Sequence, residues 1–241
     1  MKKIVLVLAA TALLTACNKK EESDKGLTLT GEVKGLTQGK LYIHKIADTS
    51  LVTLDSIIVK GDSHFSSSID LKEPEMLYLS LDRGVTESID NLIPFFAEPG
   101  TMNIETTLNE FYAKAKIKGS KNQELLELYN KTKAVFNDKQ NKTSSLLFMA
   151  GKNANSKIYD TLKQANDKLI IRKYLNAVNF AVNNGKHEVA PYIALSEISD
   201  ANIKYLDTIQ KSMSAEVAKS KYGKLLTEFV AKRKEAEQTN P

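Results

Sequence analysis

The sequence predicts an α+β protein, in which an N-terminal antiparallel β-sandwich or open barrel is followed by an α-helical domain. From Leu27 to Lys118, apolar and polar residues alternate in short runs that are separated by turn residues. After Gly119 the apolar residues recur at the period of an amphipathic helix. We therefore expect a β-sandwich-like domain at residues 27–119 and an α-helical domain at residues 120–237.

The β half is expected to consist of several short strands. A first strand is predicted at residues 27–33, where leucine and valine alternate with polar residues. Residues 52–70 predict two strands around a glycine–aspartate turn, because both residue types tolerate unusual φ angles. Residues 76–81 place three leucines on one face of a strand, and a Pro99-Gly100 turn precedes a further strand at residues 102–104.

The α half is expected to contain five helices. Apolar residues at helical spacing predict a helix over residues 122–136 and a longer one over residues 155–183. The sequence Asn-Asn-Gly after the second helix is typical of a helix C-cap. Two shorter helices are predicted at residues 188–198 and 202–213, and a final helix at residues 220–237.

The first residues of the chain predict a signal peptide. A positively charged start, Met1-Lys2-Lys3, is followed by residues 4–14, which are apolar apart from Thr11. As a helix, this apolar run would be about 16 Å long, which is roughly half of a bilayer core. We therefore expect residues 1–16 to be a signal peptide and not a membrane span.

The end of this segment, Leu14-Thr15-Ala16-Cys17, resembles the bacterial lipobox. The resemblance implies cleavage between Ala16 and Cys17 and attachment of lipid to Cys17, because only a thiol forms the required thioether. Several acyl chains would then anchor the protein durably to a membrane. Residues 17–26 are expected to be a lipidated tether that holds the folded part at the cell envelope. We expect the outer membrane, at its periplasmic face or at the cell surface.

The use of Cys17 as an anchor excludes several kinds of chemistry. It is the one cysteine of the chain, so the mature protein would have no disulfide and no thiolate for thiol–disulfide exchange. Zinc or iron–sulfur sites with cysteine ligands are excluded for the same reason. The formal net charge of +5 comes from interspersed lysines and acidic residues, so we expect no binding of nucleic acid.

Other residues with chemical potential are expected to be structural. His44, His64 and His187 are far apart in the sequence and lack the spacing of metal ligands. Glu98 lies beside a turn, and we expect it to cap that turn, because no partner carboxylate for general acid catalysis can be placed. Ser66–Ser68 lacks the context of a nucleophilic serine. We therefore expect no catalytic residue, no metal site and no cofactor.

Several segments resemble the N-terminal domain of unknown function, with its helical region, that precedes the thioredoxin-like domain in envelope thiol:disulfide interchange lipoproteins. The segments that carry this resemblance are residues 29–45, 54–65, 94–104 and 117–129. In that family the activity resides in the thioredoxin-like domain, which contains Trp-Cys-x-x-Cys. This sequence has no Trp and no second Cys. We therefore expect that domain to be absent and transfer no catalytic residue.

Two functions remain open from the sequence. The first is a membrane-anchored, non-catalytic envelope lipoprotein that acts as a binding or scaffolding module. The second is an accessory subunit of a periplasmic thiol–disulfide system, in which a thioredoxin-like partner on another chain carries the catalytic domain. Neither function makes this chain an enzyme, and the sequence leaves its oligomeric state open.

Overall fold

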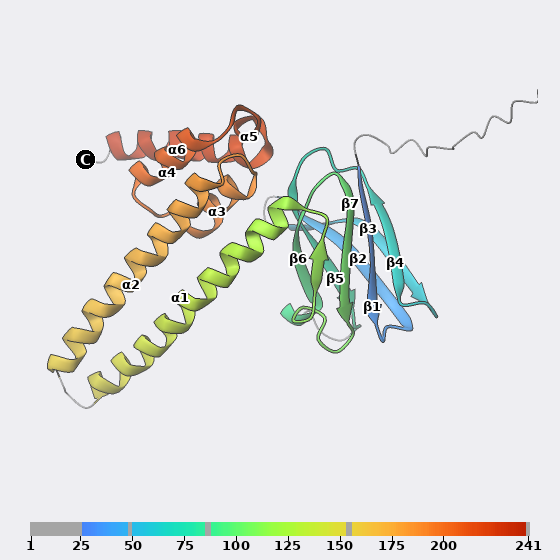
Figure 1. Ribbon diagram of the computed structural model, residues 1–241, viewed down its shortest axis with the longest axis horizontal. Helices are drawn as coiled ribbons and strands as arrows, with labels where there is room; N and C mark the ends of the chain where they lie inside the picture. Colours follow the sequence, from blue (N-terminus) through green and yellow to red (C-terminus); the bar gives the residue numbers. More distant parts are fainter. Residues whose placement is uncertain (1–25, 48–49, 85–87, 153–155, 240–241) are drawn as a thin grey trace, which may run out of the picture.

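The computed structural model of the chain describes residues 26–47, 50–84, 88–152 and 156–239. Its N-terminal half consists of strands in two packed sheets, and its C-terminal half is helical (Figure 1). The predicted α+β fold class is therefore confirmed. The expected signal peptide, its cleavage site at Ala16 and Cys17, and the tether up to residue 25 lie outside the described residues.

Among the described residues, the strands form two sheets of four strands each. One sheet has the order β4-β1-β7-β8 and the other has the order β3-β2-β5-β6. A 3₁₀ turn at Ile89–Asn91 precedes β6. The strand bounds are β1 Leu27–Lys34, β2 Gln38–Ala47, β3 Ser50–Lys60, β4 His64–Ile69, β5 Glu75–Asp82, β6 Leu92–Ala97, β7 Gly100–Thr107 and β8 Lys116–Lys118.

The pairing of β1 with β7 is parallel, which corrects the expectation of a purely antiparallel sandwich. The other strand pairs are antiparallel. Short turns join consecutive strands such as β1 to β2 and β6 to β7, so the chain reverses its direction at each turn. Two odd-numbered strands that become neighbours must then run parallel.

The core of the sandwich is formed by the inward faces of both sheets. Leu77 and Leu79 of β5 and Phe95 of β6 are completely buried there, together with Leu27 and Leu29 of β1. The predicted alternation along residues 76–81 is confirmed, because the leucines face this core. Met76 and Phe96 instead point out of the sandwich and belong to the apolar core of the helical half.

The helical half contains six helices among the described residues. Their bounds are α1 Lys121–Lys152, α2 Ser156–Asn183, α3 Val189–Glu197, α4 Ile203–Ser212, α5 Ala215–Lys219 and α6 Lys221–Thr239. The first helix is therefore much longer than the predicted 122–136, and α5 was not predicted. The polar stretch after residue 136 lacks helical periodicity, so its conformation depends on packing against α2.

The end of α2 differs in detail from the predicted C-cap. The helix ends at Asn183, as expected, but the positive φ angle typical of a C-cap glycine is absent from Gly185. A Cβ atom at Gly185 would instead lie 2.2 Å from the carbonyl oxygen of Ser212. Gly185 is thus needed for the close approach of the segment after α4, whose Ser214 N–H donates to the Gly185 carbonyl.

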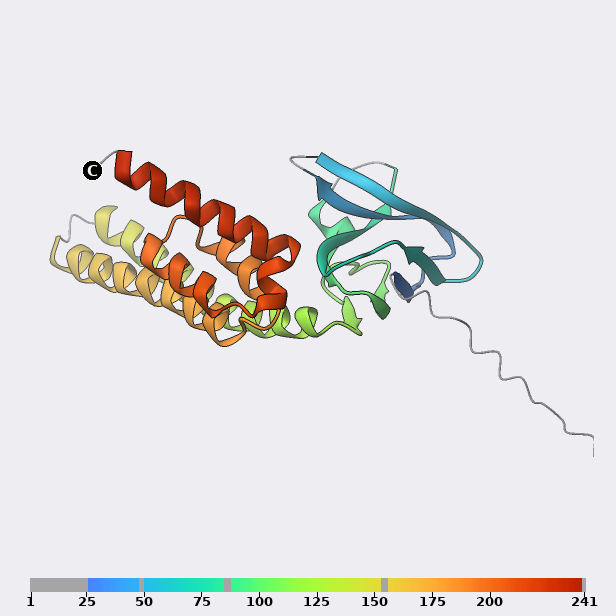
Figure 2. The same ribbon diagram turned by 90° about the horizontal axis from the view of Figure 1, so that it is seen from above.

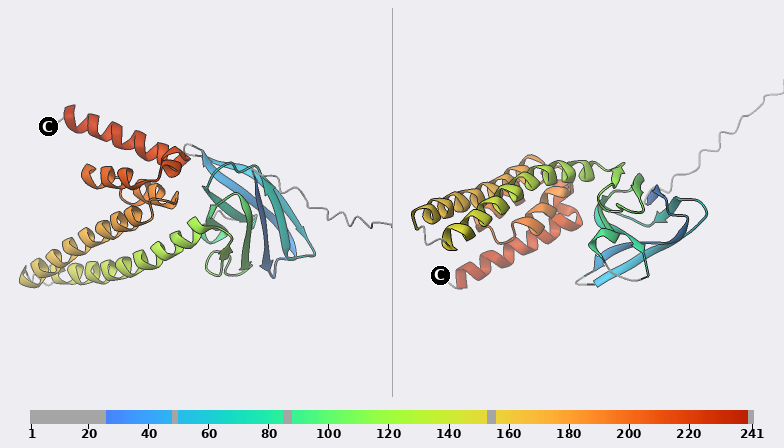
Figure 3. Two further views of the ribbon diagram at one scale, coloured as in Figure 1. Left: turned by 45° about the horizontal axis from the view of Figure 1, so that its top comes forward. Right: turned by 90° about the horizontal axis from the view of Figure 1, so that it is seen from below.

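Two helical arms diverge from the junction with the sandwich (Figure 3, left). One arm is the hairpin of α1 and α2, and the other is α6 with α4 beside it. The far end of the hairpin lies at the opposite end of the molecule from the start of β1 (Figures 1 and 2). In the part of the chain that the structure describes, no helix combines the length and the apolar character needed to cross a bilayer.

Candidate functional site

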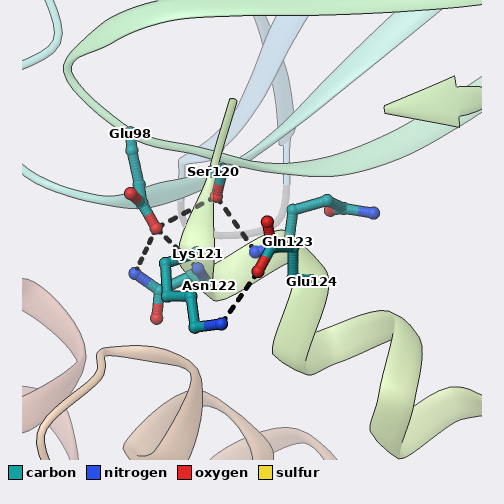
Figure 4. A network of polar contacts seen from close by, with 6 residues as sticks. All are labelled: Glu98, Ser120, Lys121, Asn122, Gln123 and Glu124. Carbon is teal, nitrogen blue, oxygen red and sulfur yellow. Dashed lines mark hydrogen bonds and ion pairs between the residues drawn. The ribbon is translucent and has the colours of Figure 1, made fainter. Parts of the chain in front are cut away.

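The two halves of the molecule meet where β6 ends and α1 begins, and Glu98 lies at this point (Figure 4). Glu98 Oε1 accepts hydrogen bonds from Ser120 Oγ at 3.0 Å, from Asn122 N at 2.6 Å and from Asn122 Nδ2 at 2.7 Å. Ser120 Oγ accepts from the Gln123 N–H at 3.0 Å, as an N-cap does. A carboxylate at this helix end also interacts favourably with the helix dipole. Glu98 therefore caps α1, and the expectation that it caps its own turn is wrong.

The backbone before α1 must pass very close to β7 to bring Ser120 under Glu98. Gly119 has a φ angle of +97°, which favours glycine, and a Cβ atom there would lie 2.3 Å from the Thr101 carbonyl oxygen. The Phe96 N–H, one strand away, donates to Gln123 Oε1 at 2.8 Å. The first turn of α1 is therefore held by the sandwich on two sides.

Asn122 joins the sandwich to the helical half. Its Nδ2 donates to Glu98 and also to Glu188 Oε2 at 2.8 Å, while its Oδ1 accepts from the Val189 N–H at 2.8 Å. Glu188 directly precedes α3. The structure thus brings a second carboxylate close to Glu98, which the sequence did not reveal. The two carboxylates share one buried amide as a donor, so their arrangement joins the two halves of the molecule.

A cluster of aromatic rings forms the apolar part of the junction. Phe96 of β6 contacts Tyr192 of α3 and Tyr222 of α6 edge to face, with ring centroids 5.5 Å and 5.7 Å apart. The Met76 N–H donates to Tyr222 Oη at 3.0 Å. Burial raises the pKa of Tyr192 to about 12 and also raises the pKa of Tyr222. Both phenols therefore stay neutral at physiological pH.

Acidic residues before and within β5 hold the start of α6. The Lys221 N–H donates to Glu73 Oε2 at 2.6 Å, and Lys221 Nζ forms an ion pair with Glu75. The ion pair is mostly shielded from solvent, so it is less weakened by salt than an exposed pair. Hydrogen bonds, ring contacts and this ion pair together make the junction an extensive interface.

The three histidines lie in separate places. His44 on β2 has Nε2 2.8 Å from Ser80 Oγ and Nδ1 3.1 Å from Thr53 Oγ1, and its burial lowers its pKa. His187 lies in the turn before α3, where its backbone N–H donates to the Asn184 carbonyl. Within the described ranges, no group of three or more His, Cys, Asp or Glu residues is arranged to hold a metal ion.

His64 lies on the opposite face of the sandwich from His44, at the start of β4. Its Nδ1 is 2.7 Å from Asp62 Oδ1, and this hydrogen bond raises the pKa of His64 and lowers the pKa of Asp62. Ser66 and Ser68 of the same strand are exposed on the outer face, whereas the buried Ser67 donates to Asp55 Oδ2. The three serines thus belong to different faces and do not form one site.

A depression lies on the outer face of the sheet formed by β4, β1, β7 and β8. It has a volume of about 460 Å³, and the side chains that line it include Thr30 and Glu32 of β1, His64 of β4, and Asn103 and Glu105 of β7. The Phe65 ring lies beneath the depression and fills the space that a side chain at position 31 would need, so Gly31 fits there. The depression is open to solvent, in contrast to the junction.

Two carboxylates lie side by side across this depression, between His64 on one side and Lys116 on the other. The strand register places His64 beside Glu32, Glu32 beside Glu105, and Glu105 beside Lys116 of β8. Two carboxylates on neighbouring strands repel each other, which is unfavourable unless a cation or a donor lies between them. Ser63 Oγ donates to Glu32 Oε1 at 3.0 Å, whereas the Glu105 carboxylate forms no hydrogen bond or ion pair with another of the described residues. The depression is therefore suited to hold a group that carries a positive charge or several hydrogen-bond donors.

Comparisons with known proteins support the domain and leave the function open. Residues 27–126 match the family model described as "Domain of unknown function (DUF4369)". No curated protein matches this sequence. One solved structure that it resembles is described as "Crystal structure of (S)-allantoin synthase", at 11% identity and a TM-score of 0.26. This similarity covers 41% of this chain and 45% of that chain, and it carries no argument.

Proposed function

Because residues 27–126 carry a domain of unknown function, we propose a function from the site itself: the protein is a non-catalytic binding module of the cell envelope. The observation that carries this proposal is the depression lined by Glu32, Glu105, His64 and Asn103. It offers two adjacent carboxylates for a cationic ligand and amide and hydroxyl groups for hydrogen bonds. The conspicuous groups of the junction, by contrast, are all engaged in holding the two halves together.

Site-specific photo-crosslinking in living cells tests this proposal. A photo-reactive amino acid at Asn103 is placed inside the depression, and a matched one at Ile58 lies exposed on β3 of the other sheet. We expect a reproducible adduct from position 103 only. The adduct should disappear when Glu32→Ala and Glu105→Ala remove both carboxylates. Equal adducts from both positions, or none from position 103, would overturn the proposal.

We further propose that the protein is a lipoprotein that is anchored through Cys17 after cleavage behind Ala16. The support is the lipobox-like sequence together with the preceding apolar segment. Metabolic labelling with an alkyne fatty acid should mark the native chain and leave a Cys17→Ala variant unlabelled. Labelling of that variant would contradict the anchor, whatever the outcome of the crosslinking experiment.

The second candidate function is that of an accessory subunit in a thiol–disulfide system. Its support is the resemblance of four segments to the domain that precedes thioredoxin-like domains. In this case the crosslinked partner should contain Trp-Cys-x-x-Cys, and deletion of the gene should change the redox state of envelope thiols. Unchanged thiols, together with a partner that lacks this motif, would leave the general binding module as the function.

A further inference from the structure

The α1–α2 hairpin carries a concentration of positive charge. Residues 131–173, which we call the basic arm, contain ten lysines and arginines against three aspartates, a net charge of +7. The whole chain has a net charge of +5, so the remaining residues together carry −2. The ion pair of Lys133 with Glu197 lies at the base of the arm, close to α3. The other charged residues lie along the arm, which extends away from the sandwich (Figure 1).

The far end of the basic arm exposes large apolar side chains. Phe148 is 65% exposed and Met149 is 57% exposed, which are high values for such residues. Leu146 on α1 and Ile158 and Tyr159 on α2 are exposed as well. Neighbouring helical residues point about 100° apart, so Phe148 and Met149 face different directions. The tip is thus apolar on more than one side.

Phe148 and Met149 contribute little to the packing of the arm. Among its described residues, Ala150 alone is buried, and the half-buried seam between the helices contains polar residues such as Gln140 and Asn166. Phe148 contacts its own helix through Lys152, whose Nζ lies 4.6 Å from the ring centroid. An exposed apolar tip that does not stabilise its own fold indicates an external partner.

We propose that the tip of the basic arm inserts into a lipid surface that carries anionic headgroups. Lipid covers apolar side chains on all sides at once, which a flat protein surface cannot do for Phe148 and Met149 together. Lys152 and Lys157 lie at the ends of the two helices beside the tip, and Lys142 lies farther back along α1. Their long apolar stems let the ammonium groups reach headgroup level while the apolar side chains insert. A second copy of the chain is a poorer partner, because two arms of net charge +7 repel each other.

This surface is separate from the depression on the sandwich and does not depend on the lipid anchor. The tip lies at the other end of the molecule from β1, so an anchored chain would have two points of contact with lipid (Figures 1 and 2). A chain that starts at Asn18 retains every described residue and removes both the apolar leader and Cys17. Any lipid binding by this chain must then come from residues other than the apolar leader and Cys17.

The experiment uses the fact that the protein has no tryptophan. Phe148→Trp introduces a single fluorescent reporter at the tip, and Tyr112→Trp introduces a matched reporter at a residue of the sandwich that is 50% exposed. Each variant is titrated with vesicles of pure phosphatidylcholine and with vesicles that also contain phosphatidylglycerol. We expect a blue shift for Phe148→Trp with anionic vesicles only, and no shift for Tyr112→Trp.

Two further pairs of variants separate the contributions to binding. Phe148→Ser with Met149→Ser should weaken partitioning into anionic vesicles by about tenfold or more, because apolar area is no longer buried. Lys152→Gln with Lys157→Gln should weaken it by about tenfold, whereas Lys40→Gln with Lys60→Gln on the sandwich should leave it unchanged. The changed side chains are exposed, so thermal unfolding of the variants should match that of the parent chain.

Three outcomes would overturn the proposal. The first is equal partitioning into neutral and anionic vesicles. The second is binding without a blue shift at position 148, with a soluble polyanion competing fully, which would indicate an acidic macromolecule as the partner. The third is a concentration-dependent dimer that Phe148→Ser abolishes, which would show that a second copy covers the tip.

Discussion

The sandwich and the basic arm differ in the burial of their phenylalanine side chains. Phe96 at the edge of the sandwich is completely buried between β6 and the helices, whereas Phe148 on the arm is 65% exposed. The buried ring contacts two tyrosines, and the exposed one contacts a lysine of its own helix. The comparison indicates that the buried cores of the sandwich and of the helices around the junction stabilise this protein more than the arm does. The arm is left with apolar groups that are available to another surface.

The largest expected effect tests this difference directly. Phe96→Ala should lower the free energy of unfolding by about 3–5 kcal/mol, because it removes a fully buried ring and leaves a cavity at the junction. Phe148→Ala should change it by less than about 0.5 kcal/mol. Urea unfolding followed by circular dichroism measures both values. Similar losses in the two variants would refute the contrast between sandwich and arm.

A smaller effect is expected from the polar part of the junction. Glu98→Ala should lower the free energy of unfolding by about 2–3 kcal/mol, because the Asn122 N–H and the Ser120 hydroxyl lose a charged acceptor. Glu98→Gln is the matched control, since it keeps a carbonyl oxygen in place of Oε1 and should cost less. Equilibrium unfolding in urea gives both values. A loss below about 0.5 kcal/mol for Glu98→Ala would show that this carboxylate is not needed for the fold.

The seam of the basic arm should respond in the other direction. Asn166 Oδ1 is buried and has no hydrogen-bond partner among the described residues. Asn166→Leu should therefore stabilise the arm by about 1 kcal/mol, because an unsatisfied polar atom is replaced by an apolar group. Hydrogen exchange of amides in α1 and α2 should slow in this variant and stay unchanged in the sandwich. Faster exchange in the arm would contradict this description of the seam.

The smallest expected effect compares the two faces of the sandwich. Burial lowers the pKa of His44 below 6.5, and the hydrogen bond to Asp62 raises the pKa of His64 above 6.5. Imidazole signals in an NMR titration should separate accordingly, and Asp62→Asn should return His64 towards 6.5 without moving His44. A pKa of His64 at or below that of His44 would contradict the assigned environments.

These two pKa shifts act on stability in opposite directions. As the pH falls below about 6.5, the unfolded chain takes up a proton that the folded chain resists at His44, so this residue destabilises the fold in acid. His64 binds its proton more tightly in the folded chain. Its contribution to stability is present below about pH 6.5 and is lost as the pH rises through the raised pKa. The exposure of the His64–Asp62 pair keeps that contribution small.

Much of the β half could be predicted because alternation reports burial on one face of a strand. The leucines at 77, 79 and 81 alternate clearly, and all three are buried in the sandwich. The parallel pairing of β1 with β7 could not be predicted, because alternation shows which face is buried and not which strand is the neighbour. The second half of α1 was missed because its side chains are largely exposed and therefore leave no apolar stripe.

The polar junction shows a similar limit of sequence reasoning. Glu98 was noticed because it lies beside a Pro-Gly turn, but the sequence did not show that it caps the distant helix α1 and not that turn. Asn122 links Glu98 to Glu188, which lies 90 positions later in the chain. No local sequence pattern reports such a contact. The acidic pair at Glu32 and Glu105 was missed for the same reason, since it arises from strand register.

The match to the domain family ends at residue 126, which lies inside α1 and beyond the Glu98 cap. The matched segment of this chain therefore includes the first helical turns with Ser120, Asn122 and Gln123, and not the sandwich alone. This segment contains the residues that hold the first turn of α1 and so fix the direction of that helix. In this chain the sandwich therefore sets the direction in which α1, and with it the whole α1–α2 hairpin, leaves the β half.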